Sequence, residues 1–154
     1  DAVRMMAKIA LEVEGSSRFD LLREPPHRPN PTYAEIIADM AYHAGRAART
    51  KAIVVFTTSG YTARLVARYR PSEPIFAFSH IEETARILAP VFGVHPVLVP
   101  RAGTTDEMLP LMEQTLVERG LVKKGDGVVF VAAHPIRRPG STNFLKLHRI
   151  GDGE

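Results

Sequence analysis

Cysteine and tryptophan are both missing from the 154 residues of this sequence. Without cysteine there is no disulfide, no thiolate ligand for a metal and no cysteine nucleophile. The absence also fits a reducing cytoplasm, which is where we expect the protein to be located. Long apolar runs are missing too, because no stretch approaches the roughly 20 residues needed to cross a bilayer. We therefore expect no membrane-spanning segment and no membrane partner.

A strong excess of charge of one sign is also missing. Lys and Arg number 20 against 17 Asp and Glu, which gives a net charge of +3 with neutral His, and the basic residues are dispersed. A dispersed and mildly basic charge argues against an arm that binds nucleic acid. Hydrophobic residues make up 45% and charged residues 24% of the chain, as in one ordinary globular domain.

The familiar catalytic and metal-binding patterns do not occur. Residues 120–126 have the glycine spacing of a phosphate-binding loop, but Asp126 stands where Lys is required. No two histidines have metal-ligand spacing, and we expect structural or surface roles for all six: His27, His43, His80, His95, His134 and His148. No nucleophile, base and orienting residue come together in the sequence. We therefore predict that this chain alone has no catalytic residue and no metal site.

The first 31 residues differ from the rest. Residues 1–14 place Val3, Met6, Ile9, Ala10 and Val13 on one helical stripe. Residues 15–31 contain four prolines, which remove backbone donors and disfavour regular structure. The sequence starts at Asp1 with no signal-peptide pattern, so we expect it to begin partway along a longer chain. We predict a short helix that docks elsewhere, followed by a Pro-rich linker.

From residue 32 onward, patterns typical of helices and strands alternate. Thr32 and Glu35 form a capping box, which predicts a helix to about Arg49. Residues 79–82 are interpreted as a second capping box, and residues 104–107 as the cap of a later helix. The first helix should bury Ile36, Ile37, Met40, Ala41 and Ala44, and further helices are expected at 61–69, 81–90 and 105–119.

The strand patterns predict the fold. Apolar runs indicate strands at 52–56, 74–78, 95–99 and 127–132, and an alternating stretch indicates a fifth, edge strand at 144–148. Residues 32–150 should therefore form a three-layer α/β/α sandwich on a five-stranded mixed sheet. Right-handed crossovers and the commonest half-Rossmann arrangement give the strand order 3-2-1-4-5. No helix separates the last two strands, so we expect the fifth to be antiparallel to the fourth, with residues 151–154 as a frayed tail.

Two loops should meet where the strand order reverses, between the first and fourth strands. The loop at 57–62 offers helix-start amides, Gly60 for close approach, and four hydroxyls. The loop at 133–143 supplies Arg137 and Arg138, whose guanidinium groups suit phosphate oxygens. Together the loops predict a site for a phosphorylated small molecule. The alternative is that Ser59 only caps a helix and that the two arginines are solvated.

Six segments, in order, resemble the C-terminal domain of pyruvate kinase. They are FTTSGYTAR at 56–64, VARYRP at 66–71, ETAR at 83–86, GVHPVL at 93–98, GLVKKGD at 120–126 and PGSTN at 139–143. The resemblance covers essentially residues 32–150. Residues 1–14 also look like the last helix of that enzyme's catalytic barrel. An ordered series of this kind is far more specific than any one short motif.

The resemblance implies a regulatory role. The family transfers a phosphoryl group from phosphoenolpyruvate to ADP, using Mg²⁺ and usually K⁺, in a barrel of about 250 residues. Those residues are not in this sequence, so no catalytic residue and no cofactor is expected in it. The family's allosteric site is what carries over, to Thr57, Thr58, Ser59, Gly60, Tyr61, Thr62, Arg137, Arg138, Gly140, Ser141 and Thr142.

The resemblance also implies partners. These are a phosphorylated effector such as a sugar phosphate or AMP, the catalytic barrel of the same protein, and further copies in a homotetramer. The sequence HPIRR at 134–138 differs from the effector loops of well-known members, so the identity of the effector stays open. The alternative is a purely structural domain that assembles the tetramer and binds no effector. A free-standing enzyme of another class would need a catalytic constellation that the sequence lacks.

Overall fold

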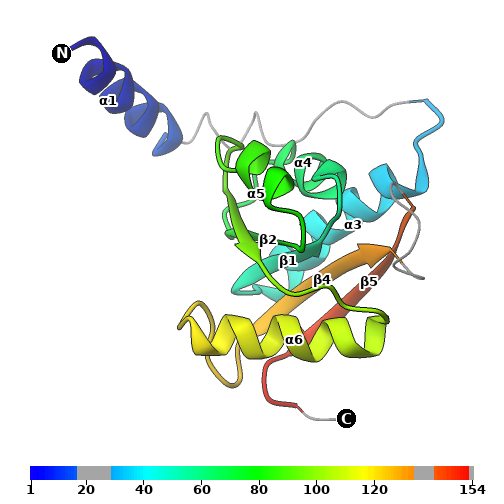
Figure 1. The fold of residues 1–154 in the computed structure, drawn as a ribbon. Helices are drawn as coiled ribbons and strands as arrows, with labels where there is room; N and C mark the ends of the chain where they lie inside the picture. Colours follow the sequence, from blue (N-terminus) through cyan, green and yellow to red (C-terminus); the bar gives the residue numbers. More distant parts are fainter. Residues whose placement is uncertain (17–28, 134–140, 153–154) are drawn as a thin grey trace.

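The computed structural model describes residues 1–16, 29–133 and 141–152 (Figure 1). Most of the Pro-rich segment (17–28) and the end of the tail (153–154) lie outside the described residues. The elements in chain order are α1 (Ala2–Glu14), α3 (Tyr33–Ala48), β1 (Ala52–Phe56), α4 (Tyr61–Ala67), β2 (Ile75–Ser79), α5 (Glu82–Leu88), β3 (Val94–Leu98), α6 (Thr105–Glu118), β4 (Gly127–Ala133) and β5 (Thr142–Arg149). Every predicted helix and strand is present, with boundaries that agree to about two residues.

The sheet has the predicted order, β3-β2-β1-β4-β5. The strand β1 pairs in parallel with both β2 and β4, and β2 pairs in parallel with β3. The last strand, β5, runs antiparallel to β4, with Val129 opposite Leu147. The reversal of strand order therefore falls between β1 and β4, where the sequence predicted it.

Helices cover both faces of this sheet (Figure 1). Successive strand residues point to opposite faces, so β1 places Val54 and Phe56 on one side and Ile53 and Val55 on the other. The first side packs against α6 through Met108, Met112 and Leu116. The second side packs against α3, α4 and α5. The three-layer α/β/α sandwich is confirmed.

The helix α3 starts as predicted, and of its predicted apolar face Ala41 is buried while Ile37 and Ala44 pack against the core. Its capping box is complete, because Thr32 accepts from the Glu35 amide while the Glu35 carboxylate accepts from the Thr32 amide. The prediction that Met40 belongs to the buried face is wrong, since its side chain is 56% exposed. The buried residues are Ala34, Ala38, Ala41, Tyr42 and Gly45. Small residues let the helix approach the sheet closely, and that contact outweighs the larger apolar side chains.

The predicted capping box at 79–82 is also wrong. The helix α5 has Ile81 at its N-cap and no side-chain cap. Ser79 is the last residue of β2, paired with Leu98 of β3, and its hydroxyl accepts from the Ile81 amide at 3.1 Å. Because Ser79 is still part of the strand, its short side chain reaches a residue two positions on and not the first turn of the helix.

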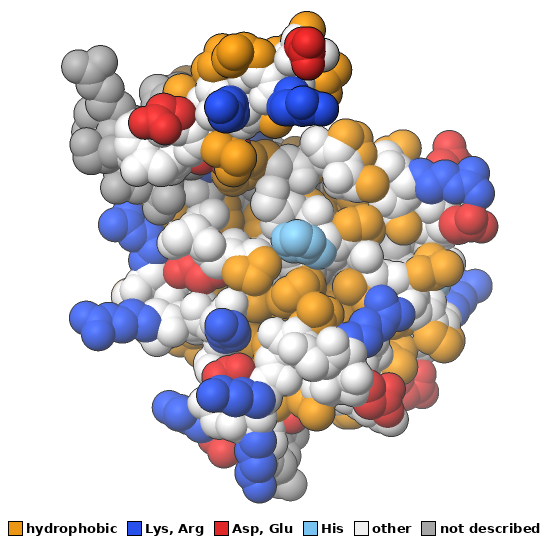
Figure 2. All heavy atoms as spheres, turned by 90° about the vertical axis from the view of Figure 1, so that its left-hand side faces the viewer, with side chains coloured by type: hydrophobic (Ala, Val, Ile, Leu, Met, Phe, Trp, Pro, Cys, Tyr) orange, Lys and Arg blue, Asp and Glu red, His pale blue; other side chains and the backbone are white. Residues whose placement is uncertain are grey.

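The helix α1 lies outside the sandwich (Figure 1). None of its residues is buried, and its apolar side chains lie open between charged ones at the top of Figure 2. The predicted apolar stripe is therefore present without a surface that covers it among the described residues. None of the helices in the described ranges is both long enough and apolar enough to cross a membrane.

Candidate functional site

The candidate site is the turn at residues 57–60, between β1 and α4. It follows the carboxyl end of β1, beside β4, where open α/β sheets bind ligands. The amide of Thr57 still donates to the Phe78 carbonyl at 2.9 Å, so the turn begins directly at the edge of the sheet.

An internal hydrogen bond shapes this turn. The Thr57 hydroxyl accepts from the Gly60 amide at 2.9 Å, in a buried position. Gly60 is the N-cap of α4 and has φ +76°, a left-handed conformation that glycine adopts without strain. Ser59 is therefore not the N-cap of α4, as the alternative interpretation predicted, because it is the residue before the N-cap. Its hydroxyl accepts from the Tyr61 amide at 3.4 Å.

The turn presents some of its groups to solvent and keeps others inside. Ser59 and Tyr61 are exposed, Thr58 is half-buried, and Thr57 and Thr62 are buried. The Ser59 hydroxyl keeps its proton for an outside acceptor while accepting from Tyr61. An anion arriving from solvent would therefore meet Ser59 first.

Two residues of the helix α5 contact the turn. The Thr84 hydroxyl donates to the Thr58 carbonyl at 2.6 Å. Leu88 lies so close under Gly60 that an added Cβ would be 3.1 Å from its side chain. The sequence did not identify Thr84 or Leu88 as part of the site. Both belong to a helix that follows a different strand, and no sequence pattern indicates their contact with the turn.

The two predicted loops do meet. The hydroxyls of Thr62 and Thr142 are 2.5 Å apart in a buried hydrogen bond, although they are 80 positions apart in the chain. Ser141 lies beside Thr142 and is half-buried. Arg137, Arg138 and Gly140, with His134, fall at residues 134–140 and lie outside the described residues.

A histidine at the same edge of the sheet was expected to have only a structural or surface role. The ring of His80 stacks on Phe56, the last residue of β1, with centroids 6.4 Å apart. Its Nδ1 atom is buried and has no hydrogen-bond partner in the described part of the chain. Every second residue of a strand points to the same face of the sheet. The positions of Phe76, Phe78 and His80 could therefore have predicted that this ring lies on the α6 side.

No group of three or more His, Asp or Glu side chains in the described ranges could hold a metal ion. The described site is built instead from hydroxyls and main-chain amides. Such groups can bind an anion, because amides at a turn and hydroxyl protons are hydrogen-bond donors.

The family described as "Pyruvate kinase, alpha/beta domain" matches residues 35–148. Pyruvate kinase from Geobacillus stearothermophilus is 39% identical over 153 residues, which cover 99% of this chain and 26% of that protein. The enzyme from Clostridium acetobutylicum is 37% identical over 151 residues, or 97% of this chain and 32% of that protein. The enzyme from Staphylococcus epidermidis is 36% identical over 153 residues. The chain thus spans between 26% and 32% of the length of these relatives.

Proposed function

Since the chain belongs to the pyruvate kinase family and is its C-terminal α/β domain, we propose that it regulates that enzyme by binding a phosphorylated effector at residues 57–62. The effector class is a sugar phosphate or AMP. The observation that carries the proposal is the Thr62–Thr142 hydrogen bond, which brings both predicted loops to one place at the sheet reversal. The exposed Ser59 hydroxyl lies at that place.

The catalytic chemistry is assigned elsewhere in the enzyme. Phosphoryl transfer from phosphoenolpyruvate to ADP, with its Mg²⁺ and K⁺, would occur in a barrel domain outside these residues. The exposed apolar stripe of α1 supports the idea that this helix packs on that barrel. Bound effector would change activity through its different affinity for two states of the whole enzyme, which we place in the cytoplasm.

Calorimetric titration tests the binding. Fructose 1,6-bisphosphate, glucose 6-phosphate, ribose 5-phosphate and AMP are titrated into the chain, and at least one should give saturable heat. Ser59→Ala should weaken that binding roughly tenfold, because a hydrogen bond to a charged group contributes about 1.5 kcal/mol or more. Ser72→Ala, at an exposed serine on another turn, is the matched control and should bind normally. The absence of heat with all four compounds would remove the proposal.

A second role, assembly of identical chains, rests on a different observation. The strand β5 forms one edge of the sheet, and Leu147 on it is 53% exposed. Tyr33 and Met40 of the neighbouring α3 are exposed as well. An open edge with apolar neighbours favours pairing with another copy. Sedimentation with and without phosphorylated ligands separates the two roles, because association that ignores every ligand would favour a purely structural domain.

A further inference from the structure

The two faces of the sheet are covered unequally. Five strands about 4.8 Å apart span about 19 Å, so each face has room for about two helices about 10 Å wide. The helices α3, α4 and α5 cover one face, whereas α6 is the only described helix on the other. The side of α6 with Met108, Met112 and Leu116 packs onto the sheet. A strip above β4 and β5, beside α6, is left without a helix in the described ranges.

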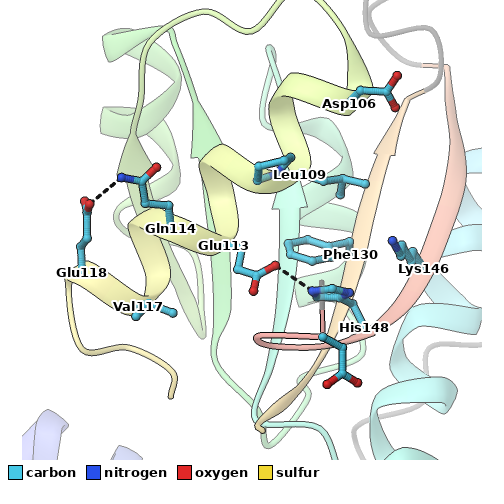
Figure 3. A pocket seen from close by; sticks show the side chains of 11 residues that line it. Asp106, Leu109, Glu113, Gln114, Val117, Glu118, Phe130, Lys146 and His148 are labelled. Atoms are coloured by element: carbon cyan, nitrogen blue, oxygen red, sulfur yellow. Dashed lines mark hydrogen bonds and ion pairs between the residues drawn. The ribbon is translucent and has the colours of Figure 1, made fainter. Parts of the chain in front are cut away.

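A groove of about 650 Å³ occupies this strip (Figure 3). One wall is a stripe of α6 that recurs every three or four residues from Asp106 to Glu118, and the other side comes from Phe130, Lys146 and His148. At about 1.5 Å per residue the stripe is about 18 Å long. A length of about 18 Å corresponds to about three turns of a helix.

The groove is preformed. The Nε2 atom of His148 on β5 is 2.8 Å from the Glu113 carboxylate of α6, as Figure 3 shows. The other oxygen of Glu113 accepts from the Gly151 amide at 2.7 Å. These bonds tie α6 to the last strand. A partner would therefore not have to order the walls, which lowers the entropic cost of binding.

The rim of the groove has a charge opposite to that of the whole chain. The net charge of the chain is +3, but four carboxylates line the groove: Asp106 and Glu118, with Glu113, which is bonded to His148, and Asp152, which lies 3.9 Å from the Arg149 guanidinium. Lys146 is the one lysine among the residues that line the groove, and it already has an interaction. Leu109, Pro110 and Val117 supply apolar surface between the charges. An apolar groove with an acidic rim selects a cationic, amphipathic occupant.

We propose that this groove docks an amphipathic helix of a partner protein, with an apolar row of side chains in the groove and Lys or Arg residues on both flanks. The helix would take the vacant place beside α6 and complete that layer of the sandwich. The groove is separate from the turn at residues 57–60, and this proposal does not depend on effector binding at that turn.

Fluorescence anisotropy with a labelled helical peptide of about fifteen residues tests the proposal. The peptide has Leu at every third or fourth position and Lys on both flanks, and a second peptide has Glu in place of every Lys. The Lys peptide should bind the chain saturably, and the Glu peptide should not. Amide shifts in an NMR titration should change along α6 and at Lys146 and His148.

Variants locate the binding. Val117→Arg places bulk and positive charge at an exposed wall position, and together D106K and E118K reverse the rim; each should weaken binding at least about tenfold. Glu83→Lys, exposed on α5, reverses one charge on the other face and should have little effect. Equal binding of both peptides, or full binding to Val117→Arg, would overturn the proposal. Self-association of the peptide-free chain that Val117→Arg abolishes would also overturn it, because the occupant would then be a second copy. Effector titration of Val117→Arg should match that of the unsubstituted chain, which separates this test from that of the proposed function.

Discussion

At the scale of single residues, the candidate site depends on a hydroxyl from outside the turn. The Thr84 hydroxyl holds the Thr58 carbonyl at 2.6 Å and so fixes one side of the turn. Thr84→Val keeps the size of the side chain but removes the donor. We expect it to cost about 1–2 kcal/mol of unfolding free energy and to weaken effector binding several-fold. Urea unfolding and calorimetry measure the two effects, and Thr84→Ser should restore both.

A second prediction at this scale concerns Tyr69. Burial, and then the charge of Asp39 and a hydrogen bond to it, raise the pKa of Tyr69 above its usual value. The folded chain therefore holds this proton more tightly than the unfolded chain. That contribution to stability is complete below the unfolded pKa of about 10 and is lost as pH rises through the folded pKa.

Tyr69→Phe should remove this part of the pH dependence. Urea unfolding at about pH 9 and about pH 11 should show a smaller loss of stability in the variant than in the unsubstituted chain. The two proteins share all other titrating groups, so the difference isolates Tyr69. An equal loss in both would show that Tyr69 does not contribute.

Residue contacts were the part least predictable from sequence. The composition of the turn, with its glycine and hydroxyls, could be identified because such residues favour one kind of local geometry. That the two loops meet was predicted from the topology, but the hydrogen bond between Thr62 and Thr142 and the contact of Thr84 with the turn were not. Packing between distant segments decides which hydroxyls stay exposed to solvent, and no local sequence pattern predicts that packing.

At the scale of elements, a capping pattern predicted a helix cap correctly where its first residue lies outside a strand. Thr32 follows residues 29–31, which belong to no strand, and caps α3 as predicted. Ser79 has the same residue pattern but is held in the ladder of β2 with β3, so the cap does not form. Thr32→Ala should therefore cost about 1 kcal/mol of unfolding free energy. Ser79 gives no cap to lose, and a loss of helix content at α5 in Ser79→Ala would contradict this account.

The isolated helix α1 gives another prediction at this scale. Its apolar stripe is exposed, and a helix of 13 residues without a packing surface is marginal in water. We expect rapid amide exchange over Ala2–Glu14 in a monomer of this chain, measured by mass spectrometry. Strong protection in a monomer would contradict the view that α1 needs a covering surface from another domain or another copy.

At the scale of the whole molecule, sequence patterns were sufficient for the sheet. Apolar runs, alternating helices and the handedness of crossovers leave few strand orders, and the observed order is the one that they favour. The groove beside α6 could not be predicted in this way. It arises from how many helices each face receives and how wide the sheet is, and these are properties of the assembled layers.

The central claim is that exposed donors at the turn before α4 hold the phosphate of a small-molecule effector. Crystal structures of the chain soaked in turn with fructose 1,6-bisphosphate, glucose 6-phosphate, ribose 5-phosphate and AMP test it most directly. The account predicts a phosphoryl group within hydrogen-bond distance of the Ser59 hydroxyl and of the main-chain amides of residues 58 and 59. A turn filled by side chains of the protein itself, with the phosphate bound elsewhere or absent, would contradict it.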